Sequence, residues 1–345
     1  MRILIICLLF INCFGARAQY TIIPDPNFET ALHWMGVDPI QGDGQVLTSN
    51  IDTVTQLIFG TLQIVDLSGI EDFTDLRKLH VDYNNITSLD LSSNVELTYV
   101  SIEGNSITNL VLGYLPNLTH LFCGGNPLSV SGLDLSNCQS LQFLGCGHGD
   151  FPTLNLGNHP AIKSIWCTGG NLYSINVSNT PNLNDLRCGA NPLTEIDFSD
   201  TPSLSRFSAP ACQLTELDFS NNSQLSSINI HTNPLQCVNL KNGFTSFAEL
   251  YVFNTPNLTC IEVQDSTAAA SWTDPGDYQF DSHILLRENC GYSCPSPTIL
   301  TDSIPNEKYV VGIFDLTGRE TLSVPNTTLI YVYSDGTKEM VYRFE

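Results

Sequence analysis

Four cysteines recur at nearly constant spacing in the middle of the chain: Cys123, Cys146, Cys167 and Cys188. Thiolates bind zinc and iron, so this series invites a metal-site interpretation. The spacing of 21 to 23 residues instead predicts one thiol per turn of a repeating structure. Such thiols stack in a line about 4.8 Å apart, which is not a tetrahedron. We expect buried apolar thiols, with a metal site or disulfides between adjacent turns as the alternatives.

A second series of side chains could hold a cation. It recurs once per repeat and is expected to point outward: Asp90, Asp134, Asn155, Asn176, Asp197, Asp218 and Asn239. Stacked carboxylates of this kind can coordinate calcium. Serine neighbours many of them, which favours a solvated face whose side chains bond the local backbone.

Known catalytic motifs do not occur. The sequence has no HExxH zinc motif, Walker A loop, Rossmann glycine fingerprint or GxSxG nucleophile elbow. Its seven histidines are scattered among different repeats. We therefore expect neither enzyme activity nor a cofactor, and a hydrolase with an unrecognised site is the least favoured alternative.

The elements that must position these residues follow a repeat of 21 residues. Each copy begins with Leu or Ile, and apolar residues stand three and five positions later. The clearest starts are Leu76, Leu97, Leu118, Leu141, Ile162, Leu183, Leu204 and Leu225. The final alternation predicts a short strand with one face inward. Because one unit cannot bury its apolar face alone, about nine units must stack around a shared core.

An asparagine follows most of the predicted strands at a fixed distance: Asn84, Asn105, Asn126, Asn191 and Asn233. A buried Asn at a turn can bond the backbone of its own coil and of the adjacent coil, so we predict a structural ladder. Gly149, Gly170 and Cys212 replace the asparagine, and one repeat carries two extra residues around Ser129 to Ser131. The ladder bonds are open to question in those coils.

These repeats resemble the leucine-rich repeat family, in the short form found in secreted bacterial surface proteins. The resemblance covers residues 54–258. It implies a leucine-rich repeat solenoid of short parallel strands with irregular or extended returns, an N-terminal helical cap and a small C-terminal β module.

The first 18 residues have the pattern of a secretory signal. Met1-Arg2 is basic, residues 3–14 are almost wholly apolar, and Ala16-Arg17-Ala18 matches a signal-peptidase site. A buried N-terminal strand is the alternative. Removing residues 1–18 leaves 11 basic against 35 acidic residues, a net charge of −24. We expect a secreted or outer cell-surface protein, in a compartment that permits disulfides.

The segment 19–53 is predicted to cap the first repeat with an amphipathic helix that ends near Met35, with Asp25 as its N-cap. The run Gly42-Asp43-Gly44 resembles the core of a calcium-binding loop. Two essential carboxylates are missing from that loop, because Pro39 and Asn50 stand in their places. We therefore favour a turn and do not expect calcium at Asp43.

Residues 259–294 resemble the C-terminal cap of the same bacterial repeat proteins, which implies a disulfide at this end of the solenoid. Cys260 and Cys290 bracket the cap and are the expected pair, with Cys237 and Cys294 as a second, less certain pair. Four cysteines allow three connectivities, so the pairing stays open here.

Residues 295–345 begin with a proline-containing linker and continue as short β-branched and aromatic strands. This segment resembles the type A C-terminal sorting domain recognised by the type IX secretion system of Bacteroidetes-type bacteria. The matching motif is Asp315-Leu316-Thr317-Gly318-Arg319, whereas the tail ends in Glu345 instead of lysines. The resemblance implies the type IX machinery as a partner; a β extension of the solenoid is the alternative.

The outward side of the predicted strands holds the candidate binding site. Stacking the repeats is expected to gather an exposed cluster of aromatic residues bordered by charged ones: Tyr99, His120, Phe122, Phe143, Trp166, Asp185, Arg187 and Arg206. Large apolar residues on a solvent face, with arginines beside them, are typical of interfaces. The alternatives are that some lie under the loop around Ser129 to Ser131, or that they merely decorate the sheet.

Composition limits the classes of partner that the protein can bind. The formal net charge of −22 argues against nucleic acid and against docking on an anionic membrane by charge. After residue 18 no apolar run is long enough to span a membrane. We expect a non-catalytic protein that binds a protein or glycan partner through the strand side. The alternative is a structural or adhesive coat component without a defined ligand, which would not need the aromatic cluster.

Overall fold

The computed structural model describes residues 19–128, 133–243, 246–272 and 274–291, together with the backbone of three later strands. Several predictions concern positions outside the described residues. They are the signal segment 1–18, the extra residues around Ser129 to Ser131, Cys294, the linker, and the motif Asp315 to Arg319.

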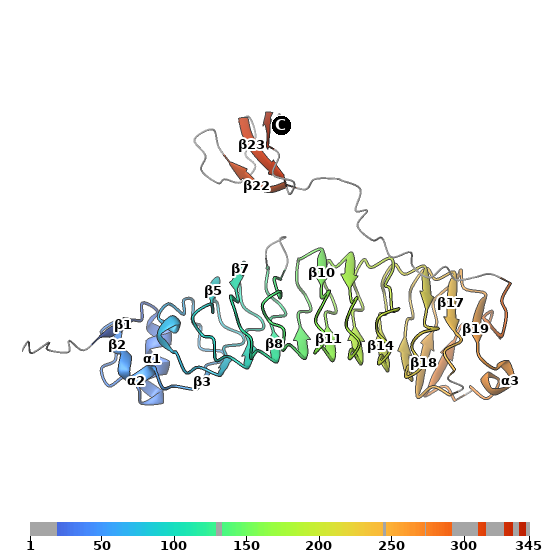
Figure 1. Cartoon of the computed structure of the whole chain (residues 1–345), viewed down its shortest axis with the longest axis horizontal. Helices are drawn as coiled ribbons and strands as arrows, with labels where there is room; N and C mark the ends of the chain where they lie inside the picture. Colours follow the sequence, from blue (N-terminus) through green and yellow to red (C-terminus); the bar gives the residue numbers. More distant parts are fainter. Residues whose placement is uncertain are drawn as a thin grey trace, which may run out of the picture.

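The repeats stack into a solenoid along which eleven short parallel strands form one continuous sheet (Figure 1). Every strand pairs in register with its neighbours, so equivalent residues of successive repeats lie side by side. This confirms the predicted leucine-rich repeat fold. In spatial order the strands are β3 (Gln56–Ile58), β4 (Lys78–His80), β6 (Tyr99–Ser101), β8 (His120–Phe122), β9 (Phe143–Gly145), β11 (Ser164–Trp166), β13 (Asp185–Arg187), β14 (Arg206–Ser208), β16 (Ser227–Asn229), β18 (Glu249–Val252) and β20 (Tyr278–Phe280).

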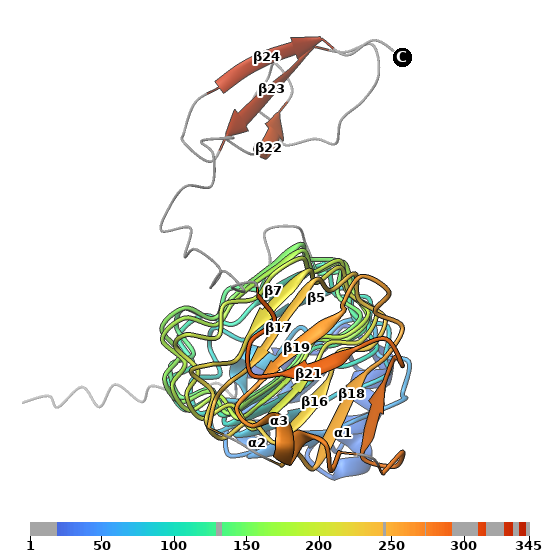
Figure 2. The same cartoon turned by 90° about the vertical axis from the view of Figure 1, so that its right-hand side faces the viewer.

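Shorter parallel ladders run along the opposite side, as the view along the solenoid shows (Figure 2). They are β5 (Ser88–Asp90) with β7 (Asn109–Val111), β10 (Thr153–Asn155) with β12 (Ser174–Asn176), and β15 (Glu216–Asp218) with β17 (Cys237–Leu240), β19 (Cys260–Val263) and β21 (Leu285–Arg287). Residues 133–135 and 196–198 carry the same alternation but form no strand. The first of these two segments directly follows, in the sequence, the two extra residues of its repeat.

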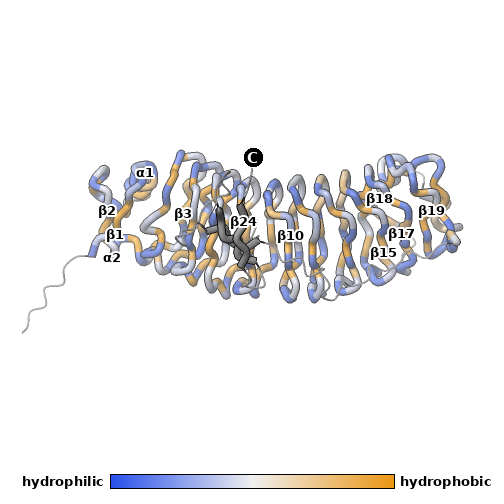
Figure 3. Tube along the Cα trace, turned by 90° about the horizontal axis from the view of Figure 1, so that it is seen from above, coloured by the Kyte–Doolittle hydropathy of each residue, from blue (hydrophilic) through white to orange (hydrophobic). Residues whose placement is uncertain are grey.

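The predicted inward residues form one core between the two sides. The first leucine or isoleucine of each repeat and the central residue of each strand of the eleven-stranded sheet from β3 to β16 are buried, Leu76, Leu79 and Val81 completely. Apolar and polar residues accordingly alternate along the whole tube (Figure 3). The core is continuous from the N-terminal cap to the last coil, as the stacking argument requires.

The asparagine ladder is present. Asn105 donates from Nδ2 to the carbonyl oxygens of Val81 and Ile102, both at 3.0 Å, and accepts from the amide of Ile86 at 3.1 Å. Its equivalents make the same bonds one coil apart: Asn84, Asn126, Asn191 and Asn233. The residue before each ladder position has a positive φ, for example 55° at Tyr83 and 63° at Gly104. The sequence pattern did not reveal this left-handed turn, because Ala, Thr, His and Tyr share it with Gly.

A second polar ladder, which the sequence did not reveal, closes the opposite turn. Asn94 and Asn222 each donate two bonds from Nδ2 to carbonyl oxygens of the preceding coil. Thr180, Thr201 and the buried His159 take the equivalent place in other coils. Polar side chains thus satisfy the backbone inside both bends.

The N-terminal cap consists of β1 (Tyr20–Ile22), α1 (Pro26–Met35), β2 (Gln45–Leu47) and α2 (Thr48–Ile51), followed by the short 3-10 turn η1 (Ile70–Asp72). Asp25 is the N-cap, as predicted: its Oδ1 accepts from the amides of Asn27 and Phe28. Its Oδ2 accepts from the amides of Val65 and Asp66 in the first coil. One carboxylate therefore joins the helix to the solenoid.

The loop around Asp43 is a turn held by a helix side chain. Glu29 Oε1 accepts from the amides of Gly42 at 3.0 Å and Gly44 at 2.8 Å. Both glycines have positive φ, 86° and 74°. The Asp43 carboxylate accepts from the amide of Gln45 within the same turn. The turn interpretation accounts for this geometry without an ion.

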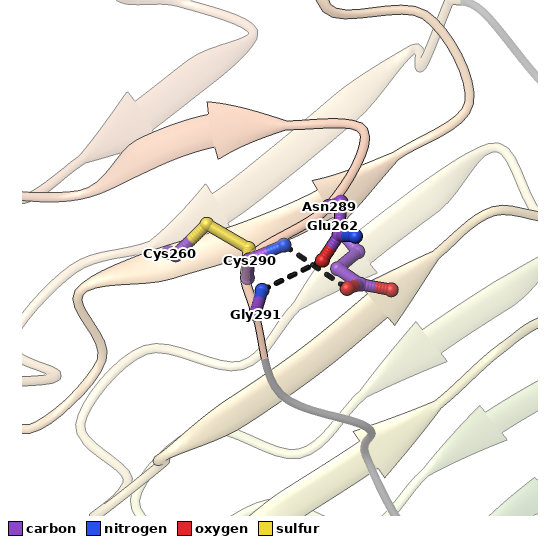
Figure 4. The surroundings of a disulfide bond; sticks show 5 residues. All are labelled: Cys260, Glu262, Asn289, Cys290 and Gly291. Carbon is purple, nitrogen blue, oxygen red and sulfur yellow. Dashed lines mark hydrogen bonds between the residues drawn. A yellow bond between two sulfur atoms is a disulfide. The ribbon is translucent and has the colours of Figure 1, made fainter.

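At the other end, the segment expected to be a separate cap continues both sides of the solenoid. β19 completes the coil that begins with β18, and α3 (Ser266–Ala269), β20 and β21 form one more coil, in which β20 pairs in parallel with β18 and β21 with β19. The irregular spacing of this coil hid it from the repeat count. Cys260 and Cys290 form a disulfide across it, and Glu262 accepts from the amide of Cys290 (Figure 4). Cys237 is also disulfide-bonded.

The C-terminal segment contains three strands: β22 (Val310–Phe314), β23 (Thr328–Tyr333) and β24 (Lys338–Tyr342). They pair as an antiparallel sheet in the order β22-β23-β24. The pairing differs from the parallel pairing of every solenoid coil. These strands therefore form a sheet of their own and do not extend the solenoid ladders.

Candidate functional site

The solvent side of the eleven-stranded sheet, here called the strand face, presents two rows of side chains. From β3 to β16 the first and third residues of each strand point outward, and parallel in-register pairing aligns them across coils. The first row contains Tyr99, His120, Phe143, Ser164, Asp185 and Arg206 in order. The third-residue row contains Ser101, Phe122, Gly145, Trp166 and Arg187.

Four rings of the strand face touch one another. His120 stacks on Phe143 with ring centres 4.5 Å apart and planes 15° from parallel. Tyr99 lies 5.7 Å from His120 and 5.8 Å from Phe122. All four side chains are half-buried, since each ring covers part of the next. We call Tyr99, His120, Phe122 and Phe143 the aromatic stack.

Burial has an electrostatic effect within the aromatic stack. Desolvation lowers the pKa of His120 below its ordinary value. Its Nδ1 lies 2.9 Å from the Thr119 hydroxyl. The imidazole is therefore held neutral at physiological pH, as an aromatic plate between Tyr99 and Phe143.

Trp166 is separate from the aromatic stack, which differs from the single exposed cluster expected from the sequence. Gly145 occupies the position between Phe122 and Trp166, and the Phe122 ring leans over it: a Cβ on Gly145 would lie 2.6 Å from Phe122 Cδ1. Within the described residues no ring pairs with Trp166, whose side chain is 46% exposed. The absent side chain at Gly145 thus divides the cluster in two.

The second group surrounds a fixed guanidinium. Arg187 donates from Nε and Nη2 to the Asp185 carboxylate at 2.8 to 3.1 Å and lies 5.0 Å from the centre of the Trp166 ring. The bond to Asp185 raises the pKa of Arg187. Arg206 is aligned with Asp185 on the next strand and is exposed. We call Trp166, Asp185, Arg187 and Arg206 the arginine site.

A polar cluster that sequence reasoning missed borders the aromatic stack on the N-terminal side. Asp82 accepts from the Ser101 hydroxyl at 2.8 Å and pairs with His80 Nε2 at 3.0 Å. Because the carboxylate lies between the serine and the histidine, the imidazole cannot take the serine proton. The order differs from that of a catalytic triad, in which histidine is central. Burial and the nearby Asp82 raise the pKa of Glu103.

The cysteine series is buried, as predicted, and carries no reactive thiol. Cys123, Cys146, Cys167 and Cys188 are free and inward, together with Cys138 and Cys212. Burial raises the pKa of Cys123 and of Cys167 to about 12. Since the thiolate is the nucleophile and metal ligand, these side chains act as apolar core residues.

The outward Asp and Asn series bonds its own backbone. Asp90, Asp134 and Asp197 accept from the amide two residues later at 2.9 to 3.0 Å, and the other members do the same. In each of these coils, one such side chain therefore stabilises the turn that follows it. Across the described residues, no group of three or more His, Cys, Asp or Glu could hold a metal ion.

A cavity of about 590 Å³ lies on the side opposite the strand face, among Leu110, Leu128, Asp134, Leu135 and His159. Its lining includes Leu128 and Leu133, the described residues that flank the extra residues of the irregular repeat in the sequence. No helix in the described part of the chain is long and apolar enough to cross a membrane.

Comparison with known proteins places the repeats beside those of internalins. No protein-family model matches the chain. Over 71 residues, 21% of the chain, it is 38% identical to internalin J of Listeria monocytogenes serotype 4b (strain F2365). The matched segment covers only 8% of the length of internalin J. The chain has the fold of a leucine-rich repeat solenoid, and over this segment its sequence is similar to that of internalin J.

Solved structures with a similar repeat architecture include two more from Listeria monocytogenes. The functional domain of InlJ, which includes a cysteine ladder, is 21% identical with a TM-score of 0.41, covering 95% of this chain and 99% of that one. Internalin C2 is 20% identical with a TM-score of 0.45, and the match covers 64% of this chain and 91% of internalin C2. The LRIM1/APL1C complex is 16% identical with a TM-score of 0.48, over 71% and 62%. These are likenesses of fold.

Proposed function

We propose that this chain is an exported, non-catalytic binding protein that recognises a protein partner through its strand face. The observation that carries the proposal is the aromatic stack, a contiguous set of large rings on the outer side of a sheet whose core lies on the inner side. A soluble monomer gains nothing from such rings in contact with water, whereas aromatic and arginine side chains are the usual anchors of interfaces.

A glycan partner and a ligand-free coat are the competing functions. A glycan would stack sugar rings on an exposed aromatic plate, and Trp166 alone is exposed to that degree on this face. A coat component would need only solubility, which the net charge of −22 provides. The half-buried, mutually packed rings favour a protein surface that covers several coils at once.

Export is part of the proposal. We assign residues 1–18 as a secretory signal, 19–53 as the N-terminal cap, 54–258 as the repeats and 259–294 as the C-terminal closure. Residues 295–345 are proposed to be a sorting module for type IX secretion, supported by the motif from Asp315 to Arg319 and by the separate antiparallel pairing of β22 to β24. Internalin-like proteins are typically surface or secreted binding proteins, which agrees with this destination.

The binding proposal is tested by selection from a phage-displayed random peptide library with immobilised full-length protein. We expect Phe122→Ala and Trp166→Ala each to weaken the selected peptides at least about tenfold at unchanged melting temperature. Tyr114→Ala and Tyr173→Ala are matched controls, since both tyrosines are more than 60% exposed and lie off the strand face. Equal losses in the controls, or none in Phe122→Ala and Trp166→Ala, would move the site elsewhere.

The export proposal needs a host that has a type IX system. A chain truncated after Cys294, which keeps both expected cysteine pairs, is expected to fold and to accumulate in the periplasm, whereas the full chain reaches the surface. Appearance of the truncated chain at the surface would refute the sorting assignment.

A further inference from the structure

The arginine site contains a guanidinium that is fixed before any partner arrives. The Asp185 carboxylate holds Nε and Nη2 of Arg187, and the guanidinium carbon lies over the Trp166 ring, 5.0 Å from its centre. Because both contacts restrict the long side chain, little further rotamer freedom is lost on binding. Among the described residues, nothing accepts a hydrogen bond from Nη1, so that end of the group can bind an acceptor.

Arg206 adds a second, unpaired guanidinium on the next strand. It stands in register with Asp185, whose two oxygens are both taken by Arg187. Arg206 is exposed and forms no ion pair with another residue of the described ranges. Its donors therefore face solvent beside those of Arg187.

The surroundings make this pair of arginines a local exception. The whole chain has 35 acidic and 13 basic residues, yet two arginines occupy adjacent strands here. A further carboxylate on the face, Glu249, stands two strands beyond Arg206; it accepts from the Ser227 hydroxyl at 2.7 Å and raises the pKa of Arg187 through its charge. Glu249 is therefore a competitor for any anion that binds at the arginine site.

We propose that the arginine site binds a carboxylate of the partner protein, carried by a segment that also places an apolar side chain on the Trp166 ring. The inference rests on the proposed function and names the chemistry of the partner. A planar carboxylate matches the forked donors of a guanidinium. Arg206 lies on the adjacent strand, diagonal to Arg187, and long side chains can reach one group across such a diagonal. An aspartate or glutamate next to an aromatic residue meets both requirements.

The test uses small probes that isolate the carboxylate. N-acetyl-L-phenylalaninate carries a ring and a carboxylate, and N-acetyl-L-phenylalanine amide is its neutral counterpart. Each is titrated into the full-length protein while the Trp166 indole N–H and the Arg187 Nε–H signals are followed by NMR. We expect the carboxylate probe to shift both signals and to bind at least about fivefold more tightly than the amide.

Charge variants separate the roles of individual residues. Arg206→Gln is expected to reduce the affinity for the carboxylate probe to about that for the amide, and Glu249→Gln is expected to increase it. Lys163→Gln removes an equal charge from a side chain that bonds Gln142 beside the face and should leave the affinity unchanged. Unchanged melting temperatures and NMR dispersion verify that each variant is folded.

The outcomes discriminate between the two proposals. Equal binding of acid and amide, or normal binding by Arg206→Gln, would overturn the carboxylate site while leaving the aromatic-stack result of the peptide selection untouched. Tighter binding of glucuronate than of N-acetyl-L-phenylalaninate would overturn the peptide source of the carboxylate. Loss of peptide binding in Phe122→Ala together with normal binding of the carboxylate probe would support both proposals, with the aromatic stack and the arginine site as separate contacts.

Discussion

Cys212 donates its thiol to the carbonyl oxygen of Cys188, 3.4 Å away, at the position where other coils place an asparagine. The equivalent Asn191 bonds the corresponding carbonyl of Cys167 at 2.8 Å and adds a bond to its own coil. The thiol is a weak donor and replaces only part of the amide. The solenoid therefore tolerates a substitute at this ladder step, but with weaker bonds.

Cys212→Asn is expected to stabilise the protein, because the amide supplies the donors and the acceptor that the thiol lacks. Asn105→Ala is expected to destabilise it by roughly 2–3 kcal/mol, since buried backbone groups of two coils lose their partner. Urea unfolding followed by circular dichroism measures both changes. A Cys212→Asn protein less stable than wild type would show that the site is shaped for sulfur.

The free cysteines should resist alkylation while the protein is folded. At pH 8, iodoacetamide is expected to leave Cys123, Cys167 and Cys138 unmodified, since their pKa values are raised to about 12, about 12 and about 11. In guanidinium chloride the same thiols should react fully. Peptide mapping without reduction reads both results and also tests the Cys260–Cys290 pair. Rapid labelling of the folded protein would contradict the burial of these cysteines.

Stability should fall as the pH drops below about 6.5, through His120 and His231. Burial lowers the pKa of both side chains from 6.5 in the folded state, so the unfolded chain takes up protons first. The stability that both neutral side chains provide above pH 6.5 is then lost as the pH falls from 6.5 to their lowered pKa values in the folded state. His120→Gln should show a smaller loss between pH 7.5 and 5.5 in urea titrations. An unchanged pH dependence would exclude His120 as a contributor.

Asp25→Ala is expected to loosen the whole N-terminal cap. The side chain accepts four backbone amides, two in α1 and two in the first coil, so its removal leaves all four unsatisfied. We expect a loss of at least about 2 kcal/mol. Hydrogen exchange should accelerate in α1 and around Val65 while the coils near Trp166 keep their protection. Asp25→Asn, which keeps one acceptor oxygen, should have a stability between those of the wild type and Asp25→Ala.

The sequence determined the elements that recur. The 21-residue period, the inward residues such as Leu79, and the Asn105 ladder all follow from local patterns, because stacking repeats one solution in every coil. The N-cap role of Asp25 was equally predictable, since it depends on the next three residues alone. The extra coil ending at β21 was not, because its spacing departs from the period.

Only the tertiary structure decided which outward side chains meet. Most of their contacts form across coils, between residues 21 or more positions apart, and depend on the size and direction of each neighbour. Gly145 separates Phe122 from Trp166, and Asp185 binds Arg187 and leaves Arg206 unpaired. A repeat pattern places these residues in a row, but packing across the row determines whether they form one site or two.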